Sequence, residues 1–226
     1  MKSVSKSRQS GFTLVEIAIV LVIIGLLLGG VLKGQEMIQN AKVKSAVNDV
    51  NGVKAAYNSY IDTFKRLPGD DGPLATLTAR GGAWATAGIT AGTNNSALAT
   101  TAAQAFGAGG ESTAFWQHLR ASGLLSGNPG TAGVAGLPRN AFDGVMGVLA
   151  GLVVPITGAN GNSICLSQVP GKAARAMDLQ LDDGITDAGS VRATLGIAGA
   201  NTAPGVAVVA ATGYNDTNIY TVCVSM

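Results

Sequence analysis

The chain has 226 residues, of which 47% are hydrophobic, 12% charged and 5% aromatic, and its formal net charge is +2. The charged fraction is about half of the ~25% typical of soluble domains, which argues against charge-driven disorder. Three basic residues lie in the first 11 positions, so 12 basic residues remain against 13 acidic ones in the rest of the chain. This balance predicts no basic surface, and nucleic acid is therefore not expected as the main ligand.

The N-terminus combines a short basic segment with a long apolar run. Residues 1–11 contain Lys2, Lys6 and Arg8 and no acid, whereas residues 12–32 contain a single charge, Glu16. As a helix, this run would be ~32 Å long, which matches the ~30 Å hydrocarbon core of a bilayer. We therefore expect residues 12–32 to span a membrane, with the basic segment on the cytoplasmic side.

The apolar run is not that of an ordinary secretory signal peptide, because it continues into an amphipathic pattern with no small-residue cleavage site after it. Helical spacing predicts one helix from Phe12 to Lys65, roughly 80 Å long, ended by Pro68 and Gly69. The apolar positions after residue 36 are Met37/Ile38, Ala41, Val43, Ala46/Val47, Val50, Val53, Tyr57, Tyr60/Ile61 and Phe64.

Glu16 is the anomaly of the apolar run. A carboxylate near the middle of a membrane helix costs ~2.5–3.5 kcal/mol on insertion scales, so it usually has a partner. One interpretation is a side chain that reaches the membrane interface. The other is an ion pair, and since residues 12–32 contain no Lys or Arg, its partner must come from elsewhere. Cleavage after Gly11 would create one, the new amino group of Phe12, on this chain or on a neighbour.

The segment Gly11-Phe12-Thr13-Leu14-Val15-Glu16, between a basic leader and an apolar run, resembles the processing site of type IV prepilins and type II secretion pseudopilins. The resemblance implies that a prepilin peptidase cuts between Gly11 and Phe12 and methylates the Phe12 amine. It also implies that Glu16 attracts the amine of a neighbouring subunit while the long helices assemble into a filament core. Many type IV pilins have a proline where this chain has Lys33, and the lack of that proline is more typical of pseudopilins and some minor pilins.

The rest of the chain is expected to form a head of α+β class, in which the long helix packs on an antiparallel β-sheet. The predicted domains are a removable leader (1–11), the long helix (12–66) and the head (67–226). Residues 74–110 are interpreted as a surface excursion, and residues 112–122 as a short helix with Phe115, Trp116 and Leu119 on one face. His118 is expected to be structural, as an exposed or half-buried side chain. The expected strands are Val145–Ile156, Ser163–Gln168, Val206–Ala211 and Asn218–Val224.

Cys165 and Cys223 each lie inside an expected strand. The membrane segment places the head outside the cytoplasm, where disulfides persist, so we expect a bond between these cysteines. The resemblance supports it, since many pilins have a C-terminal disulfide. Two buried free thiols are the alternative.

Two acidic clusters remain. Asp70 and Asp71 follow the long helix, while Asp178, Asp182, Asp183 and Asp187 surround Gly184. Turn formation and helix capping explain both clusters. No cofactor is expected, although oxygen-rich loops suit hard cations, and calcium at the second cluster stays open as an alternative. No nucleotide-binding or hydrolase motif is present, so the chain is not expected to be an enzyme.

The leading hypothesis is a structural subunit of a type IV pilus-like filament. Its expected partners are other pilin subunits, the prepilin peptidase, the inner membrane and the pilus or secretion assembly machinery. We expect it in a bacterial inner membrane before assembly and in an extracellular pilus or periplasmic pseudopilus afterwards. The alternatives are a pseudopilin of a type II secretion system and a monomeric membrane-anchored protein that binds a ligand or calcium.

Overall fold

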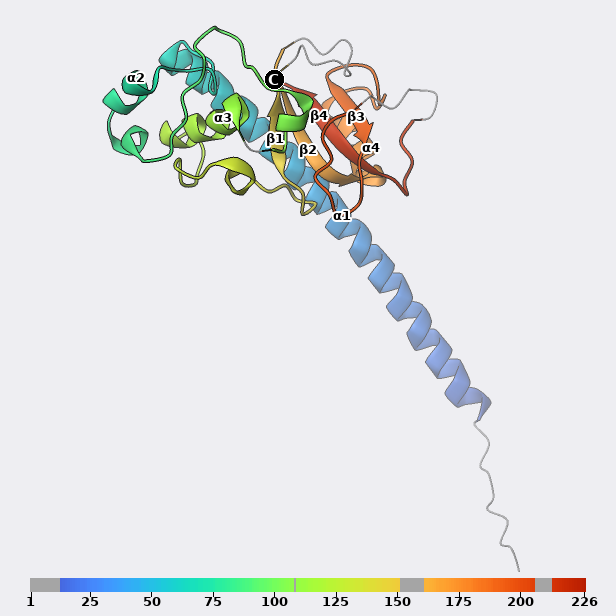
Figure 1. The fold of residues 1–226 in the computed structure, drawn as a ribbon. Helices are drawn as coiled ribbons and strands as arrows, with labels where there is room; N and C mark the ends of the chain where they lie inside the picture. The colour runs from blue at the N-terminus through green and yellow to red at the C-terminus, as the bar shows by residue number, and fades with distance from the viewer. Residues whose placement is uncertain (1–12, 108, 151–160, 206–212) are drawn as a thin grey trace, which may run out of the picture. The chain divides into compact units, whose positions relative to one another are not determined.

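The computed structural model describes residues 13–107, 109–150, 161–205 and 213–226. Its first element, α1 (Leu14–Phe64), is one uninterrupted helix of 51 residues (Figure 1). The helix ends because Lys65 adopts a left-handed conformation with φ 54°, while its N–H still donates to the carbonyl oxygen of Ile61 at 2.8 Å. The long helix predicted from the apolar spacing is therefore present.

The chain divides into two compact units, one through Ala41 and one from Lys42, so α1 contributes to both. In the second unit, α1 buries one face whose members recur every three or four residues: Val43, Ala46, Val50, Val53, Ala56 and Tyr60. Met37 and Ile38 were expected on the same apolar stripe, but they are 65% and 60% exposed. The buried stripe therefore begins at Val43, where side chains from the rest of the second unit become available to cover it.

Residues 74–110 are not a bare surface excursion as predicted. They contain the helix α2 (Leu74–Ala79) and the 3₁₀ turns η1 (Gly82–Ala85) and η2 (Ala102–Gln104). The sequence lacks periodicity here because isolated large apolar side chains, rather than a regular face, enter the core: Leu77, Trp84, Ile89, Leu98 and Phe106.

The short helix expected at residues 112–122 is α3 (Gly110–Ala121), followed by the 3₁₀ turn η3 (Gly133–Gly136). Phe115, Trp116 and Leu119 are buried, as the apolar pattern indicated. The expectation that His118 is exposed or half-buried is wrong, since its exposed fraction is 0%.

A four-stranded antiparallel sheet forms the other half of the second unit, in the order β1-β2-β4-β3. Its strands are β1 (Met146–Leu149), β2 (Ser163–Pro170), β3 (Val191–Leu195) and β4 (Ile219–Ser225), with α4 (Gly171–Leu181) between β2 and β3. The α+β class is therefore confirmed. In this half of the unit, β3 and α4 were not predicted. The strand expected at 206–211 and the end of the one expected at 145–156 lie outside the described residues.

Cys165 on β2 and Cys223 on β4 are directly paired in the strand register and form a disulfide, as expected. Both are buried in the hydrophobic core. The bond links positions 58 residues apart and ties the last strand to the sheet.

Candidate functional site

At the start of α1, the side chains of Thr13 and Glu16 each accept a hydrogen bond from the backbone N–H of the other residue. Glu16 Oε2 accepts hydrogen bonds from the backbone N–H of Thr13 at 2.7 Å and from the Thr13 hydroxyl at 2.8 Å. In return, Thr13 Oγ1 accepts from the Glu16 backbone N–H at 3.3 Å. This is a capping box, in which a Thr and a Glu three residues later satisfy the free donors at a helix N-terminus.

The sequence carried a signal for this cap that the sequence reasoning missed. Thr13 followed by Glu16 fits the Ser/Thr-x-x-Glu pattern that precedes an apolar helix. The partner that the structure gives Glu16 is therefore its own helix terminus. Gly11 and Phe12, the predicted processing residues, lie outside the described residues, so their role and the assembly role of Glu16 stay predictions.

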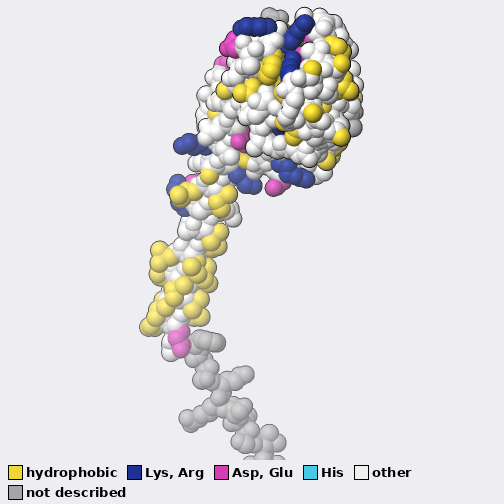
Figure 2. Space-filling view, turned by 90° about the vertical axis from the view of Figure 1, so that its left-hand side faces the viewer, with side chains coloured by type: hydrophobic (Ala, Val, Ile, Leu, Met, Phe, Trp, Pro, Cys, Tyr) yellow, Lys and Arg dark blue, Asp and Glu magenta, His cyan; other side chains and the backbone are white. Residues whose placement is uncertain are grey.

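Every residue of the stretch 14–32 of α1 is exposed, and Figure 2 shows hydrophobic side chains covering the visible face of this part of the helix. Leu14 and Leu26, for example, are 90% and 74% exposed. A side-chain carbon added at Gly25, Gly29 or Gly30 would meet no atom within 4 Å, so these positions of the helix have no neighbour among the described residues. An exposed apolar area of this extent marks a surface made for a membrane or for other protein chains.

α1 is the one described helix long and apolar enough to cross a membrane, and none of its most apolar window is buried. The apolar stretch ends at an exposed ion pair, in which Lys33 Nζ lies 3.0 Å from Glu36 Oε2. The two features define a segment about as long as a bilayer core is thick, bounded by Glu16 at one end and by paired charges at the other.

The first acidic cluster, Asp70 and Asp71, is buried and binds groups distant in the sequence. Its interpretation as a simple turn or cap is therefore corrected. Asp70 accepts hydrogen bonds from the backbone N–H groups of Asn95 (2.9 Å) and Ser96 (2.7 Å). Asp71 accepts from the Tyr60 hydroxyl (2.7 Å) and pairs with Arg80 (2.8 Å). Burial and the Asp71 carboxylate raise the pKa of Tyr60. Together, Asp70 and Asp71 fix the segment after α1 against the end of that helix.

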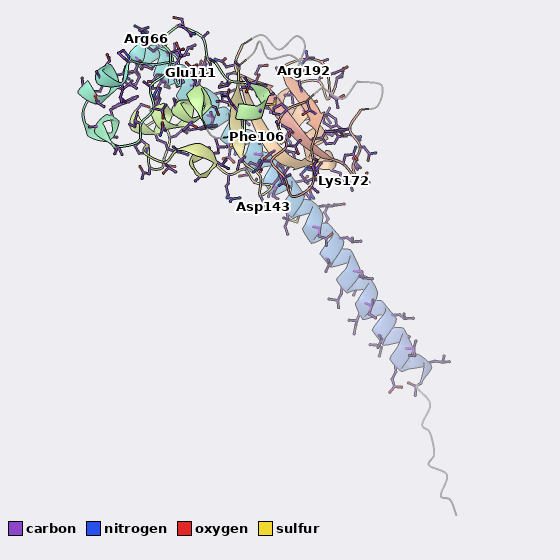
Figure 3. All side chains as sticks on the ribbon, in the orientation of Figure 1. Arg66, Phe106, Glu111, Asp143, Lys172 and Arg192 are labelled. Carbon is purple, nitrogen blue, oxygen red and sulfur yellow. A yellow bond between two sulfur atoms is a disulfide. The ribbon has the colours of Figure 1, made fainter. Side chains whose placement is uncertain are left out.

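Two side chains of α3 bond to backbone groups of the same loop region, residues 69–99. Glu111, at the start of α3 (Figure 3), accepts from the Thr93 N–H at 2.8 Å and from the Ala99 N–H. His118 Nδ1 accepts from the Gly69 N–H at 3.0 Å, and Nε2 lies 2.9 Å from the Thr90 carbonyl oxygen. Burial lowers the pKa of His118, in keeping with a neutral ring that donates through Nε2. Because backbone groups occupy both ring nitrogens, His118 is not placed for acid–base catalysis.

The second acidic cluster is only partly assembled. Asp178, Asp182 and Asp183 bring carboxylate oxygens within 4.8 Å of one another, whereas Asp187 is not part of this group. Asp178 lies on α4, is buried and accepts from the Tyr214 hydroxyl at 2.6 Å. Burial raises the pKa of this carboxyl group.

The other two carboxylates of this group, Asp182 and Asp183, accept hydrogen bonds from nearby backbone N–H groups. Asp182 Oδ2 accepts from the N–H groups of Ser190 and Val191, and Asp183 Oδ1 from that of Ile185 at 2.8 Å. Calcium prefers six to eight oxygen ligands, and backbone donors already use several oxygens here. The arrangement fits turn and cap formation, and calcium binding stays an untested alternative.

The fold and the N-terminal segment thus define a class: an α+β protein with a long apolar N-terminal helix that fits a membrane anchor. Residues 6–32 match the family model of the prokaryotic N-terminal methylation motif, which is the prepilin-type signal. This match supports a type IV pilin-like or pseudopilin protein, which is a structural rather than an enzymatic family. No curated protein and no solved structure matches the chain.

Proposed function

We propose that this protein is a structural subunit of a type IV pilus-like filament, which polymerises through α1 after cleavage between Gly11 and Phe12 and methylation of Phe12. The observation that carries the proposal is the apolar surface of residues 14–32, exposed on all sides and headed by Glu16. In this proposal the leader stays cytoplasmic, and the unit that contains the sheet lies on the other side of the inner membrane.

The proposal gives each part of the N-terminal segment a physical task. Methylated Phe12 would bear a positive charge, and Glu16 would attract this charge from a neighbouring subunit. An ion pair of this kind is worth far more in the low dielectric of a helix bundle than in water, and it would set the axial register of the subunits. Gly25, Gly29 and Gly30 would let neighbouring helices approach closely.

A pseudopilin of a type II secretion system is the second candidate. The observation that favours it is Lys33, which stands where many type IV pilins have a proline, within a helix that continues without interruption. Both candidates require the same processing and the same helix packing. They differ in where the assembled subunit is found.

Mass spectrometry of material sheared from the cell surface tests the proposal. An abundant N-methylated peptide that begins at Phe12 in this fraction is expected for a pilus subunit. The same peptide found only in the cell envelope would favour the pseudopilin. An intact Met1 leader in functional protein would contradict both and leave a simple membrane anchor.

A further inference from the structure

The part of α1 that belongs to the second unit carries two exposed charges that have no partner. Lys44 and Asp49 are both exposed, and neither forms an ion pair among the described residues. They cannot pair with each other, because five residues along a helix turn the second side chain about 140° away from the first. Partial burial raises the pKa of Asp49, in keeping with a carboxylate that has no cation beside it. Both charges are therefore available to a partner outside the chain.

Lys44 and Asp49 lie on the two flanks of the face of α1 that turns away from the core. The helical spacing puts Ser45 and Asn48 between them, and both of these uncharged side chains are exposed. A side-chain carbon added at Gly52, one turn further along this face, would meet no atom within 4 Å. Because the distance between packed helices depends on the side chains at the contact, these short residues would let a second helix come close enough to reach the flanking charges.

The proposed filament sets an axial shift between neighbouring subunits that suits this pair. If Glu16 of one copy attracts the amine of Phe12 of the next, the two copies are displaced by about four residues, equivalent to roughly 6 Å along a helix. The symmetry of a filament applies the same displacement at every level. For helices that run along the filament axis, Asp49 of the first copy is then level with Ser45 of the next and about 1.5 Å along the axis from Lys44.

No other acid of α1 beyond the apolar segment has a base at the matching position. Glu36 would be level with Leu32 of the next copy, and it already pairs with Lys33 of its own chain. Asp62 would be level with Asn58. The register therefore selects one acid and one base from this part of the helix.

We propose that Asp49 of one copy and Lys44 of the next form an ion pair that joins consecutive subunits. The partner is a second copy of this chain, because the two flanks of its helix carry opposite charges that meet in the register set by Glu16. This inference rests on the proposed function and names a contact of the filament beyond the apolar segment. The contact has a direction, since the copy that supplies the acid at Glu16 also supplies it at Asp49.

An exchange of charges tests the pair in cells that produce the full chain. Asp49→Lys or Lys44→Asp places like charges at the contact, and each should reduce the sheared filaments about fivefold at equal cellular protein. The double variant restores opposite charges and should recover native assembly. Asp62→Lys changes an exposed acid of the same helix that has no base opposite, so it is the matched control and should assemble normally.

Pairs of introduced cysteines locate the contact directly. Asp49→Cys with Lys44→Cys should give disulfide-linked ladders under mild oxidation, in whichever fraction holds the processed subunit. The two cysteines cannot bond within one helix, because a disulfide needs Cα atoms within ~7 Å and five helical residues span more than that. The native Cys165 and Cys223 are already paired. Asp62→Cys with Lys44→Cys is the control and should give no ladder.

Three results would overturn the ion pair and leave the filament in place. They are filaments without the ladder, a double charge exchange that fails to recover assembly, and an Asp62→Lys variant as defective as Asp49→Lys. Arg139 lines the same cavity as Asp49, so recovery of Asp49→Lys by Arg139→Asp would assign the carboxylate to a partner in its own chain and also overturn the inference. A native chain that is neither processed nor assembled would instead contradict the proposed function, and the ion pair with it.

Discussion

The two halves of α1 have opposite surroundings, and their sequences differ to match. Residues 14–32 are apolar on every side and exposed, whereas the stripe from Val43 to Tyr60 occupies one face and is buried within its own unit. A one-sided stripe can be covered by a single sheet and its neighbouring helices. An all-round apolar surface cannot, and it requires a membrane or several other chains. The first half of α1 is therefore suited to contacts outside the subunit, and the second half to the folding of its own unit.

The largest expected effect is a loss of filament assembly, caused by a substitution in the first half of α1. Glu16→Ala removes the only charge of the apolar segment and should abolish filament assembly, because the amine of the next subunit loses its counter-charge. Shearing cells and quantifying surface filaments measures this. Lys33→Ala, at the exposed ion pair beyond the apolar segment, is the control and should assemble. Normal filaments from Glu16→Ala would support the monomeric anchor instead.

The next largest expected effect is a loss of stability in the unit that contains the second half of α1 and the sheet. Replacing both Cys165 and Cys223 by Ala removes the bond across 58 residues and should lower the free energy of unfolding by about 4 kcal/mol, since the unfolded chain regains loop entropy. Denaturant unfolding of the full chain in detergent measures it. An unchanged midpoint would show that the sheet does not depend on this link.

A matched pair of valines compares the two halves directly. Val50 is fully buried, so Val50→Ala should cost about 2 kcal/mol through lost contacts and a small cavity. Val22 is 63% exposed in the single chain, and Val22→Ala should leave unfolding of the second unit unchanged. Equal losses in the two variants, measured by urea unfolding, would show that both halves of α1 contribute equally to the stability of the second unit.

The smallest effect is a pH dependence confined to the second unit. Because burial lowers the pKa of His118, the unfolded state binds a proton more readily than the folded state. The stabilisation from the neutral ring is therefore complete above the unfolded pKa of about 6.5 and is lost as pH falls through the lower folded value. Urea midpoints at pH 8 and pH 5 should differ more for the native chain than for His118→Gln. Equal differences would place the titration elsewhere.

The sequence was sufficient to predict features that depend on long local patterns. The apolar run, the length of α1, three strands and the Cys165–Cys223 bond follow from periodicity, strand composition and cysteine placement. β3 (Val191–Leu195) was missed because Arg192 and Thr194 interrupt a very short run, and α4 because it begins directly after a strand that ends in Pro170.

The buried polar network could not be predicted in the same way. Asp70 bonds to residues 25 and 26 positions away, and His118 to a residue 49 positions away. Such pairings depend on the folded path of residues 69–100, which has no periodic signal. The cap formed by Thr13 and Glu16 is the opposite case, a local pattern visible in the sequence that was passed over.

That cap has a consequence for the subunit before it assembles. A free subunit diffusing in the bilayer would not carry a bare acid, because the donors of Thr13 already engage the Glu16 carboxylate. Under the proposed function, docking is then an exchange of one set of donors for another. The cap would keep the Glu16 carboxylate hydrogen-bonded while the subunit is unassembled. Only a partner with a full positive charge would replace the Thr13 donors.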